Sequence, residues 1–273
     1  GAVQKLLAVA EHPHNSPIIK NGRVVSGYGL FVPEVHNSLK SKFATGFTKL
    51  MAGNTGFSSY DSFACEKYQL LFGESIFGGK GLINVDAYYE TLDKSLPRER
   101  VLSHDTVESG YLRTAYVPDV QFAESFPETV DIDRVAIKRS FHLLFHVAQF
   151  RIGGDFQNIG FVFGENPMNA LSRYKILDNI RRDMHSFLCV SAIVFSAFIQ
   201  GDAGIILAVI SLFSLCCEWV YSAFLSAENG FANVSFSGVS APALELVLRA
   251  FVSLAFAVKE AYICFDAAVK ALW

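Results

Sequence analysis

The hexapeptide at residues 103–108, Ser-His-Asp-Thr-Val-Glu, groups two carboxylates and an imidazole. It follows an apolar pair at 101–102, so it lies where a short strand is expected to end and a helix to begin. Ligands of α/β proteins gather at this end of the strands, and a carboxylate there can act as a general base. Asp105 is therefore the candidate catalytic base, with His104 and Glu108 beside it. Plain helix capping by Asp105, with Glu108 three residues later, fits the same spacing and is compatible with catalysis.

A glycine-rich turn at residues 78–81, Gly-Gly-Lys-Gly, offers a second set of candidates. Its backbone can approach a ligand closely, and its lysine supplies one cation, as a phosphate or a sugar requires. Gly79, Lys80 and Gly81 are therefore candidate substrate-binding residues, although a plain glycine turn fits equally well. The turn is not a P-loop, because no hydroxyl residue follows the lysine.

A third candidate segment is residues 151–157, Arg-Ile-Gly-Gly-Asp-Phe-Gln. Its cation, carboxylate, aromatic ring and amide are the groups that hold a phosphate or stack on a sugar. This composition makes Arg151, Asp155, Phe156 and Gln157 candidate substrate-binding residues. An ordinary loop has the same composition.

The chain shows no spacing typical of a metal site. His142 and His146 stand four residues apart, as two ligands on one helix would. However, the zinc-protease motif needs Glu after the first His, and here Leu143 follows it. The sequence therefore predicts no metal site within this chain.

The elements that must position these residues alternate between strands and helices. The expected elements are a strand over 21–33 that stops at Pro33, helices near 58–72 and 86–94, a strand end turning into a helix over 101–112, a strand over 118–123, and helices over 133–149 and 167–182. This alternation predicts an α/β domain.

The last third of the chain has a different composition. Residues 184–273 hold three of the 23 Lys and Arg and six of the 26 Asp and Glu, and residues 184–217 carry a single charge, Asp202. Two membrane spans of about 17 and 23 residues, joined by a turn, fit this run, since about 20 residues cross a bilayer. A buried helical hairpin in a soluble protein is the alternative. The basic helix over 167–182 would suit the membrane surface, and its arginines place the preceding domain on the cytoplasmic side.

The overall charge bears on possible partners. A net charge of -3 and the lack of a basic tail exclude a nucleic-acid-binding protein.

Several ordered stretches resemble the glycosyltransferase domain of the cyclic β-1,2-glucan synthases, the family 84 glycosyltransferases. The stretches that carry the resemblance are His12-Pro-His-Asn-Ser-Pro17, Gly22-Arg-Val-Val-Ser-Gly-Tyr-Gly29, Tyr68-Gln-Leu-Leu-Phe-Gly-Glu74, Gly79-Lys-Gly-Leu-Ile-Asn-Val-Asp-Ala87, Leu102-Ser-His-Asp105 with Glu108, Gly154-Asp-Phe-Gln157, residues 166–182 and residues 260–273. The resemblance runs nearly from end to end.

The resemblance implies a fold and a location. Residues 1–165 would be the C-terminal part of a GT-A-like (Rossmann-like) α/β domain, residues 166–183 an amphipathic interfacial helix, and residues 184–273 a transmembrane helical region. The catalytic domain would then lie on the cytoplasmic side of a bacterial inner membrane, and the lipid bilayer would be a partner. The nucleotide-binding half is expected upstream of Gly1. The phosphorylase-type module of the full synthases is not seen in this chain.

The resemblance also implies a reaction. Glucose would pass from UDP-glucose, with inversion, to the 2-hydroxyl of a growing β-1,2-glucan, with Asp105 as base and His104 and Glu108 positioning it or the acceptor. The segment from Arg151 to Gln157 would meet the donor diphosphate or the acceptor sugar. A divalent cation, Mg²⁺ or Mn²⁺, is implied, with ligands upstream of this chain, so that the chain alone would not catalyse. A membrane-anchored homologue that binds or assembles carbohydrate without catalysis is the alternative.

Overall fold

The computed structural model of the chain describes residues 1–38, 40, 59–93, 95–96, 104–124, 149, 152–232 and 236–272. The chain forms two compact units, residues 1–180 and residues 181–271. The expected strand end at 101–103, almost all of the expected helix at 133–149 with its two histidines, and Arg151 lie outside the described residues. The three-part division of the chain stays a prediction.

The first unit opens with a helix and a β-hairpin. Helix α1 spans Ala2–Ala10, a 3-10 turn spans Pro13–Asn15, and strands β1 (Ile18–Lys20) and β2 (Arg23–Ser26) pair antiparallel. Asn21 and Gly22 join the strands with φ of 52° and 76°, as a two-residue hairpin turn requires. The continuous strand expected over 21–33 is therefore wrong, since β2 ends at Ser26.

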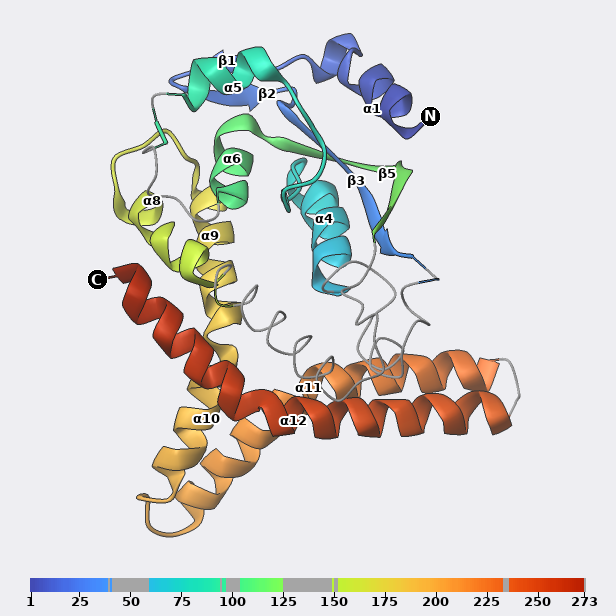
Figure 1. The fold of residues 1–273 in the computed structure, drawn as a ribbon, viewed down its shortest axis with the longest axis vertical. Helices are drawn as coiled ribbons and strands as arrows, with labels where there is room; N and C mark the ends of the chain where they lie inside the picture. The colour runs from blue at the N-terminus through green and yellow to red at the C-terminus, as the bar shows by residue number, and fades with distance from the viewer. Residues whose placement is uncertain are drawn as a thin grey trace, which may run out of the picture. The chain divides into compact units, whose positions relative to one another are not determined.

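A three-stranded sheet forms the centre of this unit. Strand β3 (Leu30–Asn37) lies between β4 (Leu82–Ile83) and β5 (Thr114–Glu124), parallel to β5 and antiparallel to β4. Figure 1 shows β3 and β5 side by side. The sequence placed the strand end at Pro33, but β3 continues and its register slips instead. Pro33 faces Val117, whereas Glu34 faces Gln121. Proline has no N–H for the ladder, so a bulge accommodates it.

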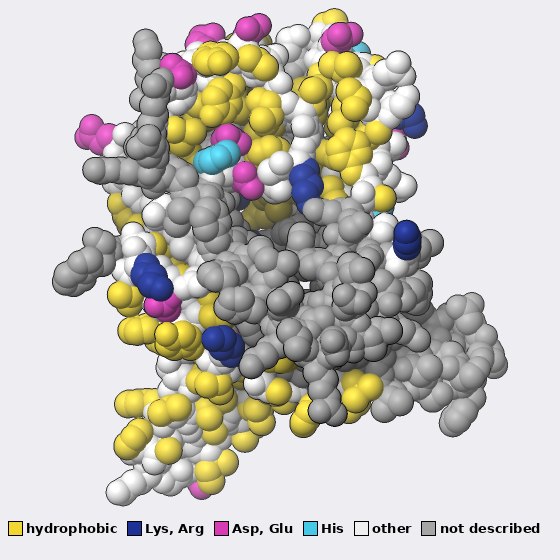
Figure 2. Space-filling model, viewed as in Figure 1, with side chains coloured by type: hydrophobic (Ala, Val, Ile, Leu, Met, Phe, Trp, Pro, Cys, Tyr) yellow, Lys and Arg dark blue, Asp and Glu magenta, His cyan; other side chains and the backbone are white. Residues whose placement is uncertain are grey.

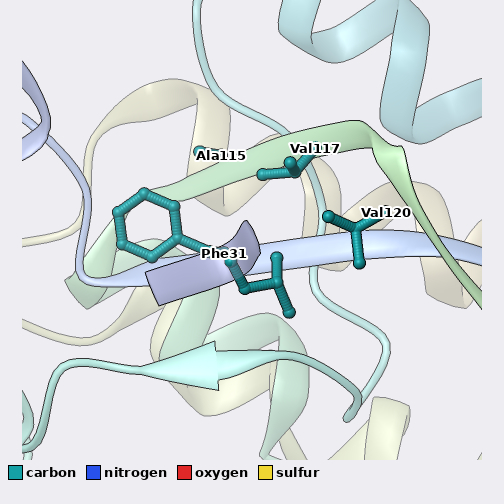
Figure 3. Packing of buried hydrophobic residues seen from close by; sticks show 5 residues of the cluster. Phe31, Ala115, Val117 and Val120 are labelled. Carbon is teal, nitrogen blue, oxygen red and sulfur yellow. The ribbon is translucent and has the colours of Figure 1, made fainter. Parts of the chain in front are cut away.

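A hydrophobic cluster fixes this sheet against α1. Leu6 of α1, Phe31 of β3, and Ala115, Val117 and Val120 of β5 are all buried together (Figure 3). The cluster immobilises the start of β5, which directly follows the helix that carries Asp105.

Three of the remaining helices of the first unit lie between strands in the sequence and contact them, and two follow the last strand. They are α4 (Ser59–Phe72), α5 (Val85–Thr91), α6 (Asp105–Leu112), α8 (Ile159–Phe163) and α9 (Ala170–Asp183). The helices expected near 58–72 and 86–94, and the helix that begins at the acidic hexapeptide, are confirmed. Val107 and Leu112 of α6 are completely buried, so apolar packing holds this short helix in the unit.

Helix α9, the basic helix expected at a membrane surface, packs one face into the protein. Lys175, Ile176 and Asp178 are buried within the first unit. Arg173 donates hydrogen bonds to the carbonyl oxygens of Val162, at 2.7 Å, and of Gly164. Charges spaced along a helix suit a membrane surface when they face outward, and here one face of α9 points into the protein; an interfacial position of its other face stays a prediction.

The second unit consists of helices α10 (His185–Ser196), α11 (Asp202–Ala232) and α12 (Phe236–Leu272), with α10 packed against α11. The turn between α10 and α11 contains Gly201, whose φ of 79° favours glycine. The expected helix break at this glycine is confirmed.

The structure corrects the predicted fold class in two respects. Among the residues that it describes, no helix has both the length and the apolar character needed to cross a membrane. Helix α10, with 12 residues, is only about 18 Å long, whereas a bilayer core is about 30 Å thick. In the same residues the sheets have two and three strands, so the larger Rossmann-like sheet is not found there either. The described part is a mixed helix and sheet fold with small sheets.

Candidate functional site

Helix α6 begins within the acidic hexapeptide, and the structure shows whether Asp105 caps it. His104 is the N-cap residue, Asp105 is the first residue inside the helix, and no side chain caps the helix by a hydrogen bond. Capping by Asp105 is therefore not the role that the structure gives this side chain. Carboxylates in a first helical turn interact favourably with the helix dipole, which accounts for the local preference for Asp105 and Glu108 without using their oxygens as caps.

The three polar side chains lie together at this helix start. His104 Nδ1 is 2.8 Å from Glu108 Oε1 and 4.0 Å from Asp105 Oδ1. The Glu108 side chain is 4% exposed, whereas those of Asp105 and His104 are 35% and 49% exposed. Glu108 thus lies beneath the surface and orients the imidazole, while Asp105 remains open to solvent. Figure 2 shows acidic side chains around a histidine, with apolar side chains nearby.

The two carboxyls have altered acidity. Burial raises the pKa of Asp105, and the nearby His104 opposes this rise. Burial also raises the pKa of Glu108, with His104 again opposing it and Asp105 adding to it. A carboxylate with a raised pKa holds a proton more strongly than an ordinary one, which is a property of a general base.

The glycine turn lies directly against the Asp105 carboxyl. Gly79 has φ of 77°, and a Cβ placed on it would be 2.9 Å from Asp105 Oδ2. A Cβ on Gly81 would be 2.3 Å from the carbonyl oxygen of Phe31 in β3. The structure therefore brings two separately predicted candidate segments together, and places Lys80 between these two close approaches.

The Asp155 segment joins the same region through another residue. Residues 152–157 are helical and Asp155 is 4% exposed. The Asn179 side chain of α9 donates hydrogen bonds from Nδ2 to Thr106 Oγ1, at 3.0 Å, and to Asp155 Oδ1, at 3.4 Å. Asp155 is thereby connected to the residue that follows Asp105. Phe156 is buried and Gln157 half-buried, and contact of either with substrate stays a prediction.

A buried ionic cluster beside the site was not predicted from the sequence. Glu74 Oε1 is 3.1 Å from Lys175 Nζ, and Glu74 Oε2 is 3.3 Å from Arg113 Nε. Burial lowers the pKa of Lys175, and Glu74 opposes this. Arg113 also donates to the carbonyl oxygen of Gly73 and lies over the Tyr28 ring. The signals in the sequence were that Glu74 and Lys175 each lie within a stretch that resembles the family.

The donor set at the start of α6 suits a divalent cation by type. One ligand atom from each of His104, Asp105 and Glu108 lies within 4.8 Å of the others. Carboxylates with one imidazole suit Mn²⁺ better than Mg²⁺, which prefers oxygen ligands. The short contact between His104 and Glu108 would have to open to admit an ion, so the arrangement as it stands favours an ion pair over a metal centre.

Comparison with known proteins finds a similar curated protein. No family model matches the chain. The chain is 32% identical over 221 residues to the cyclic beta-(1,2)-glucan synthase NdvB of Rhizobium meliloti (strain 1021), an alignment that covers 78% of this chain. The chain spans about 7% of the length of that protein. The resemblance stated from the sequence motifs is confirmed.

Proposed function

We propose, on the premise that this chain is a relative of the cyclic β-(1,2)-glucan synthases, that it forms part of an inverting glycosyltransferase. The proposed reaction moves glucose from UDP-glucose to the 2-hydroxyl of a growing β-1,2-glucan. One observation carries the proposal: the Asp105 carboxyl is partly exposed, has a raised pKa and lies against a glycine backbone beside the paired His104 and Glu108.

The proposed step has a simple balance. The acceptor oxygen forms a bond to C1 of glucose as its proton passes to the Asp105 carboxylate, and the C1–O bond to UDP breaks, with the electron pair leaving on UDP. Attack from the face opposite the departing UDP inverts the anomeric carbon. The sugar passes through an oxocarbenium-like state, as in glycoside hydrolysis. A base positioned for this proton contributes about 10²- to 10⁴-fold in rate.

The neighbouring groups have supporting roles in this proposal. Glu108 holds the His104 imidazole beside Asp105 at a contact of 2.8 Å, where the ring can bind an acceptor hydroxyl. The backbone of Gly79 and Gly81 lets a sugar approach closely, and the Lys80 ammonium can pair with a phosphate. Asp155, Phe156 and Gln157 are proposed to contact the donor or acceptor from the adjoining segment.

A divalent cation, when bound, would neutralise charge on the departing diphosphate. The proposal keeps its ligands upstream of this chain and leaves Asp105 free to accept a proton. Association with a bacterial inner membrane also stays a prediction, which fractionation of cells that express the complete gene product tests.

The experiment compares Asp105→Asn with wild type in the complete gene product that contains this chain. Transfer from radiolabelled UDP-glucose is measured with linkage analysis of the product, and UDP-glucose binding is measured separately. We expect glucan synthesis to fall by at least about 10²-fold while UDP-glucose binding persists. Asp119→Asn, which changes an exposed aspartate of β5, is the matched control and is expected to retain activity.

Activity of Asp105→Asn within a few-fold of wild type would remove Asp105 from the base role. Binding of β-glucan without any glucose transfer by the wild-type protein would instead favour the non-catalytic carbohydrate-binding alternative.

A further inference from the structure

Helix α6, which presents Asp105, is too short to hold its own first turn. It has eight residues and no side-chain cap, and isolated helices shorter than about 12 residues are marginal in water. Contacts from elsewhere must therefore fix the position of its first residues.

One face of α9 supplies such contacts at both ends of α6. At the first end, Asn179 Nδ2 donates to Thr106 Oγ1 at 3.0 Å. At the other end, Arg113 is the C-cap residue of α6, and its guanidinium binds Glu74, which Lys175 also binds. Lys175 and Asn179 are four residues apart, so they lie one above the other on the same face of α9.

The contacts at the C-terminal end reach the glycine turn as well. Lys175 Nζ donates to the carbonyl oxygen of Ser75 at 2.8 Å, three residues before the turn begins. Ser109 of α6 shares a hydrogen bond of 2.9 Å with Thr114 and donates to the same Ser75 oxygen. Lys175 therefore stabilises several segments of the fold, whereas Asn179 contacts the residue next to Asp105.

The Asn179 amide is suited to this place because it donates two hydrogen bonds from one nitrogen. Its second acceptor is Asp155 Oδ1, at 3.4 Å, and Asp155 is buried. A carboxylate at this position could donate neither bond and would repel Asp155, and an apolar side chain would leave the buried carboxylate short of a donor. The side chain thus ties the residue next to Asp105 to a rigid, buried group.

We propose that Asn179 is a positioning residue for the general base: its hydrogen bond to Thr106 holds the first turn of α6 so that Asp105 faces the acceptor hydroxyl. This inference rests on the proposed function. Misplacement of a reacting group by about 1 Å costs about 10²-fold in rate, so release of this turn lowers kcat. Thr106→Val should leave the KM for UDP-glucose nearly unchanged, since Thr106 holds the base and not the donor. Asn179→Ala also removes the hydrogen bond to Asp155, which is proposed to contact the donor or acceptor, so the KM test is made on Thr106→Val.

The test uses four single variants of the complete gene product, Asn179→Ala, Thr106→Val, Thr106→Ser and Asp105→Asn, and one double variant. Thr106→Val keeps the shape of the side chain and removes the acceptor, whereas Thr106→Ser keeps the hydroxyl. We expect Asn179→Ala and Thr106→Val each to lower kcat by about 10- to 100-fold, with the KM of Thr106→Val within about twofold of wild type, and Thr106→Ser to retain activity. The double variant Asn179→Ala/Thr106→Val should be no slower than Asn179→Ala alone, because the bond that Thr106→Val removes is already lost in Asn179→Ala.

Two results would overturn the inference while the proposed function stands. One is kcat of Asn179→Ala and Thr106→Val near that of wild type while Asp105→Asn is inactive. The other is a loss of activity that matches the loss of folded protein measured by circular dichroism, so that kcat per folded molecule is unchanged. An active Asp105→Asn would instead refute the proposed function.

Discussion

Replacement of Gly79 by Ala should separate the activity of this site from the stability of the fold. The new Cβ would lie 2.9 Å from Asp105 Oδ2, and ordinary contacts begin near 3.5 Å. The carboxyl must therefore move by about half an ångström or more, or change rotamer. The Asp105 carboxyl is the end of a partly exposed side chain, so it can rotate away while the backbone stays in position. The base is then displaced although the protein remains folded.

The magnitudes follow from the two parts of this perturbation. An alanine at φ of 77° costs about 1–2 kcal/mol of stability. Displacement of the base lowers kcat by about 10- to 100-fold. The activity is measured as glucose transfer by the complete gene product, and the stability as the free energy of unfolding in urea.

Two neighbouring glycines provide matched controls. A Cβ on Gly78 would meet open space, so Gly78→Ala should retain both activity and stability. A Cβ on Gly81 would meet the backbone of Phe31 at 2.3 Å, so Gly81→Ala should reduce the yield of folded protein. A folded Gly79→Ala variant as active as Gly78→Ala would refute the placement of Asp105 as the reacting group.

Two further expectations concern stability. Asp105→Asn should raise Tm near neutral pH. Burial raises the pKa of Asp105 above its ordinary 3.8, so the folded protein loses stability as pH rises through that pKa and the carboxyl ionises. The amide of the variant does not ionise and avoids this loss. Thermal unfolding at about pH 7 and about pH 3 measures this gain, which should vanish at the lower pH; a variant with lower Tm at the higher pH contradicts it. Glu74→Gln should cost about 3–5 kcal/mol, since it leaves Lys175 buried without its carboxylate, and Lys175→Met should cost less because Glu74 keeps Arg113. Urea unfolding of both variants checks this order, and the reverse order would show that the cluster is not held by its shared carboxylate.

Local patterns in the sequence were sufficient to predict where the helix that carries Asp105 begins. The acidic hexapeptide predicted the start of a helix, and α6 begins there at Asp105. The glycines at 79 and 81 were predicted to let a ligand approach closely. In the structure the close approaches are to Asp105 and to the backbone of Phe31, and ligand binding at this turn stays a prediction. Such features depend on a few adjacent residues, so their physical chemistry can be read from the sequence.

The contacts between distant segments could not be read in this way. Lys175 was placed on a membrane-facing helix, because an amphipathic pattern does not show which partner covers each face. Asn179 has no pattern that marks its bond to Thr106, 73 residues earlier. The hairpin was missed although Asn21-Gly22 is a typical hairpin turn, because the flanking strands have only three and four residues.

The wide separation of its parts along the chain also governs when this site can form. Strand β3 pairs in parallel with β5, from Leu30 to Thr114 onward, and Lys175 reaches back 101 residues to Glu74. A ribosome adds about 5–20 residues per second, so Glu74 waits roughly 5–20 s for its lysine to emerge. During that interval the ionic cluster lacks its lysine, so this part of the fold is completed only after residue 175 has been synthesised.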